Sequence, residues 1–274
     1  VARCQACDSP NTREEKITCD VVSDRSGKTL NFIVCADCNF HFAPGNTYTY
    51  FAEEAFDEDT YNGLGRAGTK SKPGREFGMA RMTKKILDLA NKEVASILIL
   101  GAGLSKDHAW IGKKFPSIRV SVCDLENFQK IDNFVPIDSN EKFDVIVACE
   151  CIEHFTDLEF DFGTIFSKLS KDGIAIFSTN VNDGSDVARH AYPFLSGHTS
   201  YYSGRALQKI AKRIDSSLEV DFRAPLACLG QLGAKKRYVF MHSDPAIREA
   251  ISEYFAAHLM ADSEPIVHLS LLFR

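Results

Sequence analysis

The chain has 274 residues, of which 45% are hydrophobic and 25% are charged, and its formal net charge is −5. These values are typical of a soluble globular protein with one large domain and a small appendage, or with two domains. The acidic balance argues against a broad basic surface for nucleic acid, so no nucleic-acid partner is expected. No apolar run approaches the ~18–20 residues that span a bilayer, so we expect no membrane span.

Cysteines mark the N-terminal part of the chain. Four of the nine cysteines form two Cys-x-x-Cys pairs, Cys4 with Cys7 and Cys35 with Cys38, and the others are scattered. That pattern suits a reducing compartment with one metal site, so the predicted location is cytoplasmic. Each pair places two thiolates on one tight turn, and four thiolates suit a tetrahedral Zn²⁺ ion. Because four protein ligands leave no open position, we expect this zinc to be structural; redox cysteines of thioredoxin type would occur as a single pair.

Residues 1–45 are predicted to be a small zinc-ribbon-like β unit, the zinc-binding knuckle. The β-prone runs 16–22 and 29–34 flank a turn that contains Gly27, which indicates a hairpin. Residues 46–75 form an aromatic and glycine-rich stretch, which we interpret as a connector or a lid.

Residues 76–274 are predicted to form the main domain. A helical stripe of apolar residues runs from Phe77 to Ala90, and short apolar runs then alternate with helical segments. The predicted strands are 95–100, 118–123, 143–149, 173–178, 218–222 and 238–242. The predicted helices are 105–114, 158–169, 201–214 and 245–260. Strands that alternate with helices predict parallel βαβ units in an α/β fold, with a doubly wound, mostly parallel sheet covered on both faces.

A glycine turn follows the first strand of this domain. Gly101-Ala102-Gly103 comes directly after an apolar run, and glycines at such a place let the backbone turn tightly and approach a ligand. Asp124 follows 21 residues after Gly103, at the end of the next predicted strand. A carboxylate there can accept hydrogen bonds from ribose hydroxyls, so the pattern predicts an adenosine-type ligand. The spacing by itself leaves open whether that ligand is a dinucleotide or S-adenosylmethionine.

Two observations favour the methyl donor. Ser105 stands near the place of the third glycine of the dinucleotide fingerprint G-x-G-x-x-G, so this fingerprint is not matched. Segments 143–155, 169–180 and 198–207 resemble, in this order, motifs of class I S-adenosylmethionine-dependent methyltransferases, and the resemblance covers about residues 77–242. The cysteine pairs and the aromatic stretch that follows them are similar to the N-terminal zinc region of methyltransferases that act on nucleotide-linked deoxysugars and surface polysaccharides.

The resemblance implies a Rossmann-like, seven-stranded sheet and transfer of a methyl group to a small polar acceptor, such as a sugar, a nucleotide sugar or a surface polysaccharide precursor. The chain departs from the family at Ile99, where the family usually has an acid that orients the methionine part of the donor. Without that acid, the amino group would bind backbone carbonyls around Gly101 or another side chain. The implied cofactor-binding residues are Gly101, Ala102, Gly103, Asp124, Leu125, Asp132 and Cys149.

Methyl transfer needs positioning of the two partners and, for some acceptors, removal of a proton. His154 is the predicted general base, and Glu150 is predicted to contact the cofactor or the acceptor. The predicted acceptor-binding residues are Asn180, His198 and Tyr202. Each has a plainer alternative, namely helix capping or ordinary packing. We expect Glu153 to be structural or to face solvent, and Lys235-Lys236-Arg237 to form a charged turn.

Two other functions remain possible at this point. An NAD(P)-dependent oxidoreductase would use the same glycine turn. A zinc-ribbon adaptor with a degenerate, non-catalytic Rossmann domain would account for the missing acid at Ile99.

Overall fold

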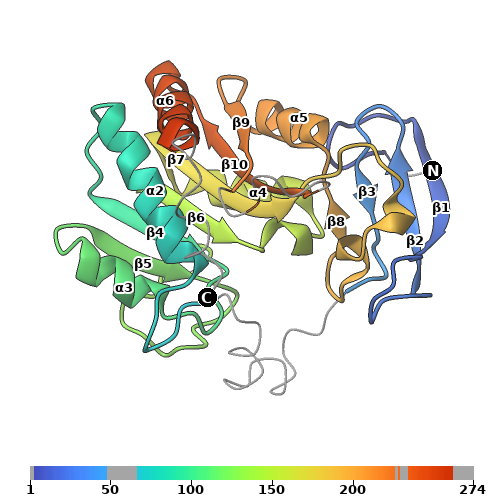
Figure 1. Ribbon diagram of the computed structural model, residues 1–274, viewed down its shortest axis with the longest axis horizontal. Helices are drawn as coiled ribbons and strands as arrows, with labels where there is room; N and C mark the ends of the chain where they lie inside the picture. Colours follow the sequence, from blue (N-terminus) through green and yellow to red (C-terminus); the bar gives the residue numbers. More distant parts are fainter. Residues whose placement is uncertain (1–2, 48–66, 226–227, 229–233, 262–274) are drawn as a thin grey trace.

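The computed structural model describes residues 3–47, 67–225, 228 and 234–261. Most of the predicted connector, residues 48–66, therefore lies outside the described residues. Two sheets organise the chain: a four-stranded sheet built mainly from the N-terminal residues and a six-stranded sheet beside it (Figure 1).

The six-stranded sheet has the strand order β5-β4-β6-β7-β10-β9. Its strands are β4 (Ser96–Leu100), β5 (Arg119–Cys123), β6 (Phe143–Cys149), β7 (Leu169–Asn180), β9 (Glu219–Arg223) and β10 (Lys236–His242). The first four in the order are parallel to one another, whereas β10 is antiparallel to both β7 and β9. Every residue of β4 is buried, which is why the sequence has a continuous apolar run there. The predicted mostly parallel α/β fold is confirmed.

The described sheet has six strands, one fewer than the seven expected. Beyond β5 the chain makes only an isolated parallel bridge between Val122 and Phe134. The amide of Val122 donates to the carbonyl of Asn133 (3.0 Å), and the amide of Val135 donates to the carbonyl of Val122 (2.8 Å). Pro136 follows at once and has no N–H group to continue the pairing. The seventh position is therefore reduced to one bridge at the sheet edge.

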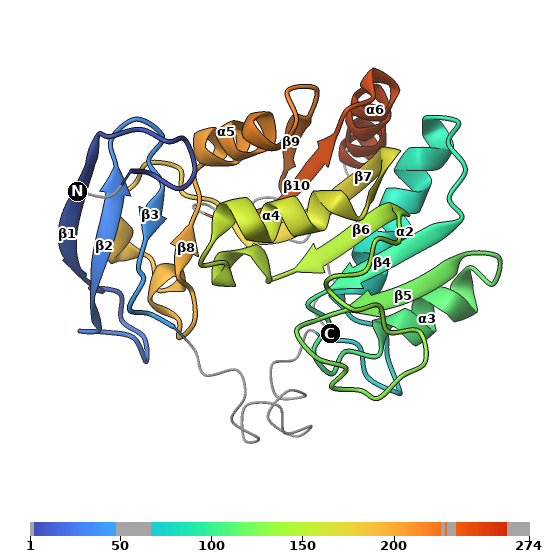
Figure 2. The same cartoon turned by 180° about the vertical axis from the view of Figure 1, so that it is seen from behind.

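Helices cover both faces of this sheet, as the doubly wound prediction requires. One face carries α2 (Arg75–Leu89), α3 (Asp107–Lys114) and α6 (Pro245–Ala261), and the other carries α4 (Leu158–Ser167) and α5 (Gly204–Ile214) (Figures 1 and 2). Each face has its own cluster of buried apolar side chains. The burial of both clusters supplies the main stabilising free energy of the domain.

The predicted N-terminal hairpin is present, but its first strand is shifted. β1 (Thr12–Thr18) pairs with β2 (Thr29–Cys35) in antiparallel register, whereas the sequence indicated 16–22 for the first strand. β1 is an edge strand with no fully buried residue, so it has no apolar pattern to reveal it. The residues after it form a loop in which the Gly27 amide donates to the Cys19 carbonyl (2.9 Å).

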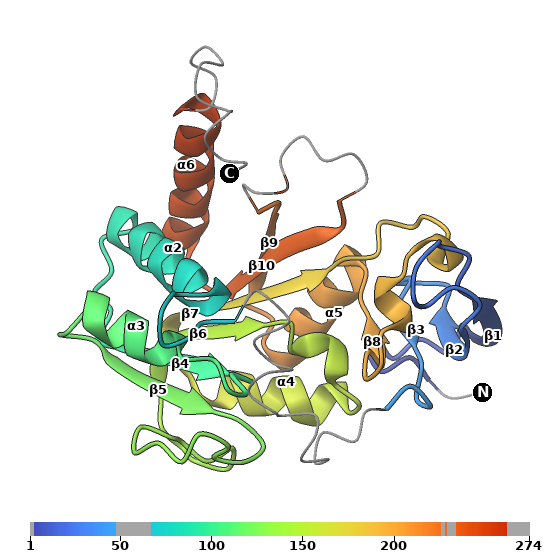
Figure 3. The same ribbon diagram turned by 60° about the horizontal axis from the view of Figure 1, so that its bottom comes forward.

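A segment far along the chain completes the small sheet. β3 (His41–Phe42) pairs with β2 on one side and with β8 (Ser200–Tyr201) on the other. Figure 3 shows β8 beside the N-terminal strands. The predicted helix 201–214 therefore begins later, at Gly204, because Ser203 caps it by accepting a hydrogen bond from the Ala206 amide (3.0 Å). The N-terminal unit and the predicted acceptor segment thus share one sheet.

Candidate active site

The ends of four parallel strands define one edge of the large sheet. Leu100 is paired with both Cys123 and Ala148, and Cys149 is paired with Ser178. Because the strands are parallel and in register, the residues that follow them lie along the same edge, where ligands of such folds bind. Gly101, Asp124 and Glu150 follow their strands, and Asn180 is the last residue of β7.

The glycine turn after β4 has the backbone that only glycine adopts easily. Gly101 has φ 67° and Gly103 has φ 53°, both in the left-handed region. A Cβ atom at Gly101 would lie 2.8 Å from the Sγ atom of Cys151. Ala102, between the two glycines, is buried, and the Gly101 amide donates to the Cys123 carbonyl (2.9 Å). The turn is therefore fixed between the tips of β5 and β6.

Asp124 holds this turn from the neighbouring strand. Its carboxylate accepts one hydrogen bond from the Gly103 amide and one from the Leu125 amide, each 2.8 Å long. Burial raises the pKa of Asp124, and the two amide donors act in the opposite direction. The side chain of Leu125 is 56% exposed. The predicted ribose-binding acid thus also sets the shape of the glycine turn.

The two other predicted cofactor residues differ in exposure. Cys149 is buried at the end of β6, and burial raises the pKa of its thiol. Asp132 is exposed in the segment between β5 and β6, close to the Val122–Phe134 bridge in the sequence. Contact of either residue with a cofactor stays a prediction.

A buried acidic pair lies at the start of α2, next to the glycine turn. Glu76 accepts a hydrogen bond from the Ser105 hydroxyl (3.1 Å). Asp107 accepts hydrogen bonds from the amides of Gly74 (2.7 Å) and Phe77 (3.1 Å), so it serves as the cap that α2 lacks in its own sequence. Burial, followed by the hydrogen bond and charge of Asp107, raises the pKa of Glu76 to about 8. These acids were not among the predicted site residues, because no local sequence pattern pairs them.

Glu150 is the centre of a charged group at the tip of β6. It has φ 52°, an unusual conformation for a residue with a side chain. Its carboxylate forms an ion pair with Lys236, accepts a hydrogen bond from the Ser178 hydroxyl (3.2 Å) and lies 3.8 Å from the Arg75 guanidinium. Lys236 is the first residue of β10 and pairs with Glu150, so its assignment to a charged turn was wrong.

A second polar group follows directly in the short helix η2 (Ile152–His154). Glu153 is completely buried rather than facing solvent, and it accepts a hydrogen bond from the Tyr192 hydroxyl. His154 contacts the Gly197 carbonyl through Nδ1 (2.9 Å), and its ring lies 4.9 Å from the ring of His198. Burial, with the nearby His154, lowers the pKa of His198 to about 3, so its imidazole is neutral. The structure thus brings two predicted site residues together.

The remaining predicted acceptor residues lie near this group. Asn180 is half-buried at the end of β7 and is opposite Lys236 in the strand register. Tyr202 is completely buried, and its hydroxyl donates to the Ile152 carbonyl (2.7 Å). Tyr202 therefore packs beneath η2, and its contact with an acceptor stays a prediction.

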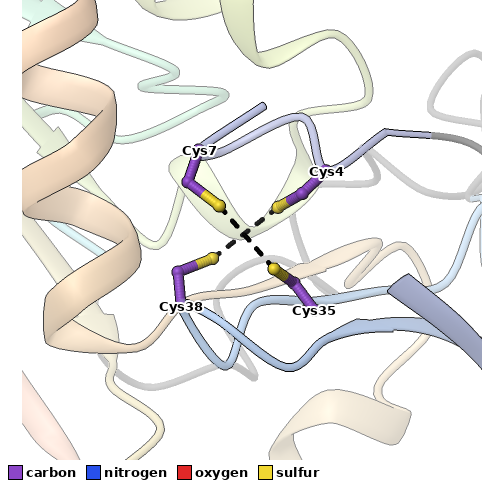
Figure 4. A group of neighbouring side chains, drawn as sticks. All are labelled: Cys4, Cys7, Cys35 and Cys38. Atoms are coloured by element: carbon purple, nitrogen blue, oxygen red, sulfur yellow. Dashed lines mark hydrogen bonds between the residues drawn. The ribbon is translucent and has the colours of Figure 1, made fainter. Parts of the chain in front are cut away.

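The four paired cysteines converge at the N-terminal unit (Figure 4). The Sγ atoms of Cys4 and Cys38 are 3.6 Å apart, as are those of Cys7 and Cys35. Thiolates around a zinc ion with bonds of about 2.3 Å are about 3.8 Å apart. The two turns are alike, because the amide four residues after the first cysteine donates to that cysteine's carbonyl in each (2.8 and 2.9 Å). The donor set and its spacing fit a tetrahedral zinc ion.

A family model for methyltransferase domains matches residues 75–218, which is more than half of the chain. The chain belongs to this family. It is an S-adenosylmethionine-dependent methyltransferase, and the glycine turn with Asp124 lies inside the matched region. The match favours methyl transfer over the NAD(P)-dependent and non-catalytic alternatives. Arg75, Glu76 and Glu153 also lie within the family match, whereas Lys236 lies beyond it.

Solved structures of methyltransferases are similar to this chain at low identity. The plantazolicin methyltransferase BpumL in complex with SAH is 14% identical, with a TM-score of 0.46, over 62% of this chain and 85% of that chain. The Burkholderia thailandensis 1,6-didemethyltoxoflavin-N1-methyltransferase is 16% identical, with a TM-score of 0.46, over 76% of this chain and 97% of that chain. A search of curated proteins finds no match. Within the described residues, no helix has the length and apolar content that a bilayer crossing requires.

Proposed function

We propose that this methyltransferase acts on a small polar acceptor such as a sugar, a nucleotide sugar or a surface polysaccharide precursor, and that a structural zinc ion holds its N-terminal unit. The observation that carries the proposal is the shared β3–β8 pairing, which places the cysteine unit against the segment predicted to bind the acceptor. The likeness of the cysteine pairs to those of sugar methyltransferases supports the acceptor class.

The cofactor site is proposed at the glycine turn. The amides and carbonyls of Gly101–Gly103 would approach the amino acid part of the cofactor, and Asp124 would accept hydrogen bonds from the ribose. Bound S-adenosylmethionine supplies a methyl group on a positively charged sulfur atom. The chain's own contribution is to hold the two partners in line and to exclude water from the edge of the sheet.

The start of α2 offers a replacement for the acid that the family usually has at the position of Ile99. Arg75 carries a cationic group suited to the carboxylate of an amino acid, and Glu76 carries an anionic group suited to its ammonium. Glu76 is 5% exposed and lies beside a second acid, an arrangement that a bound cation would stabilise. We propose that these two side chains orient the methionine part of the donor.

The acceptor is proposed to bind between the sheet edge and the small sheet. Glu150 and His154 follow β6, His198 precedes β8, and Asn180 is the last residue of β7. His154 is held by the Gly197 carbonyl, which favours the tautomer with its proton on Nδ1. In that tautomer Nε2 carries the lone pair, so His154 is suited to take a proton from the acceptor.

The zinc ion is proposed to bind Cys4, Cys7, Cys35 and Cys38. Three of the four cysteines are buried, and the Cys38 carbonyl accepts a hydrogen bond from the Ser203 hydroxyl. Four thiolates complete the coordination of zinc, so the ion would stabilise the unit and take no part in the chemistry. None of the nine cysteines forms a disulfide, which suits the cytoplasm.

An acceptor screen tests the proposal. Zinc-loaded protein is incubated with S-adenosylmethionine and matched panels of nucleotide sugars, free sugars, catechols and amines, and products are detected by mass spectrometry. A single added methyl group on a sugar-containing acceptor, with equal release of S-adenosylhomocysteine, supports the acceptor class. Methylation of catechols or amines alone, with every sugar unmodified, would contradict it.

A further inference from the structure

We propose that Glu153, His154 and His198 form a binding site for a divalent transition-metal ion, and that this ion binds an oxygen atom of the methyl acceptor. The proposal deepens the proposed function, on which its account of the acceptor rests, and it concerns a site separate from the cysteine cluster.

The three side chains are close enough to share one ion. One ligand atom from each lies within 4.8 Å of the other two. Neighbouring ligands of an ion with bonds of about 2.1 Å are about 3.0–3.4 Å apart, so an inward movement of about 1 Å or more would complete the contacts. Two imidazoles and one carboxylate are a ligand set typical of manganese, iron, cobalt and zinc sites that keep open positions.

Two buried atoms of this cluster also need a partner. The Oε2 atom of Glu153 and the Nδ1 atom of His198 are buried and have no hydrogen-bond partner among the residues that the structure describes. Glu153 is 0% exposed and His198 is 8% exposed. Buried polar atoms of native proteins are almost always partnered, and a metal ion would satisfy such atoms.

Outer contacts hold the proposed ligands in place. The Tyr192 hydroxyl donates to the Oε1 atom of Glu153 and also contacts the Thr179 hydroxyl (3.0 Å). The Gly197 carbonyl contacts Nδ1 of His154. Carboxylates and histidines that bind metals are commonly oriented by such second contacts. Glu150 is not among the residues whose ligand atoms converge here, and its Oε1 atom contacts Lys236 and Ser178 instead.

The location suits a role in acceptor binding. Cys151, one residue before η2, lies against Gly101 of the glycine turn. His198 lies just before β8 of the small sheet, and β8 packs against η2. The ion would therefore lie where the two sheets meet, next to the cofactor site.

The open positions would accept hard oxygen ligands, which points to a hydroxyl-bearing acceptor. The ion would lower the pKa of the acceptor hydroxyl, and the proton of that hydroxyl would pass to solvent water. The oxygen would then form a bond to the methyl carbon while the carbon–sulfur bond breaks and its electron pair stays on sulfur. In this arrangement His154 binds the ion instead of acting as the base itself.

Manganese binding to the full-length, zinc-loaded protein tests the proposal. Mn²⁺ prefers nitrogen and oxygen ligands and does not displace zinc from thiolates. Electron paramagnetic resonance is used to count bound Mn²⁺, and S-adenosylhomocysteine is titrated in parallel. We expect one Mn²⁺ per chain, bound at least about tenfold more weakly in the Glu153→Gln and His198→Gln variants. His190→Gln is the matched control, because His190 lies in the same segment and hydrogen-bonds to Ser185 instead (2.7 Å).

The outcomes separate this site from the proposed function. Binding of S-adenosylhomocysteine without any Mn²⁺ binding would overturn the metal site and leave the methyltransferase site intact. Mn²⁺ binding that survives in both variants would also overturn it. Mn²⁺ binding that is lost in the variants, in protein that binds no S-adenosylhomocysteine, would support the metal site and contradict the proposed cofactor site.

Discussion

The hydroxyl of Ser203 donates a hydrogen bond to the carbonyl of Cys38 and accepts one from the amide of Ala206, so a single side chain connects a cysteine turn to the start of α5. This contact joins residues that are 165 positions apart in the sequence. It couples the N-terminal unit to the helix that follows the predicted acceptor segment.

Ser203→Ala removes both hydrogen bonds. We expect the free energy of unfolding to fall by about 1–2 kcal/mol, because a helix cap is lost and the Cys38 carbonyl loses its donor. Chemical denaturation measures the change. Ser216→Ala is the control, because Ser216 is exposed after the same helix. Equal effects of the two substitutions would contradict the coupling.

Removal of zinc should loosen the small sheet first. We expect one zinc per chain in the purified protein, and a chelator should increase hydrogen exchange in β2, β3, β8 and the first turn of α5 before it affects β4 and β6. Cys38→Ser should lose the zinc, whereas Cys228→Ser should keep it. An equal rise of hydrogen exchange in both sheets would contradict the prediction that zinc stabilises the small sheet selectively.

Asp124→Asn tests the ribose contact while it keeps the size of the side chain. We expect the affinity for S-adenosylhomocysteine to fall at least about tenfold, because an amide replaces one of two acceptor oxygens. Calorimetric titration measures the affinity, with Asp138→Asn as an exposed control in the segment after β5. Unchanged affinity in Asp124→Asn would remove Asp124 from the cofactor site.

Gly101→Ala tests the glycine turn. We expect a loss of stability of about 1–3 kcal/mol from the left-handed backbone, together with weaker cofactor binding, because the new Cβ meets the Cys151 sulfur. The double variant with Cys151→Ala should recover the part of the loss that comes from this contact and keep the backbone part. Full recovery in the double variant would show that the backbone conformation contributes nothing.

The pH dependence of stability follows from Glu76. Its pKa in the folded protein is about 8, whereas an unperturbed Glu has a value of 4.5. As the pH rises from about 4.5 to 8, the unfolded chain releases a proton that the folded Glu76–Asp107 pair retains, so folding becomes less favourable. Glu76→Gln should therefore stabilise the cofactor-free protein more at pH 8 than at pH 5, by an amount on the order of 3 kcal/mol.

Thermal denaturation at the two pH values measures this difference, with the exposed Glu93→Gln as control. The same Glu76→Gln variant should bind S-adenosylhomocysteine more weakly, because the ammonium loses its anionic partner. A variant that is stabilised equally at both pH values would contradict the raised pKa.

The sequence predicted best what is encoded locally. Buried parallel strands such as β4 are continuous apolar runs, and each Cys-x-x-Cys turn is closed within five residues. The edge strand β1 was predicted too far along the sequence, because both of its faces are accessible and no apolar pattern marks it. Strand β8 has only two residues, too few for a recognisable pattern. Contacts between distant segments could not be predicted from local patterns. The Glu150–Lys236 ion pair joins residues 86 positions apart, and the Glu153–Tyr192 contact depends on a loop between β7 and β8.

Calorimetric titration of the zinc-loaded protein with S-adenosylhomocysteine, with NAD⁺ and NADP⁺ in parallel, tests the central claim most directly. We expect one binding site of micromolar affinity for S-adenosylhomocysteine, weakened by Asp124→Asn, and no binding of either dinucleotide. Folded protein with one zinc per chain that binds no S-adenosylhomocysteine, or that binds a dinucleotide instead, would contradict the account.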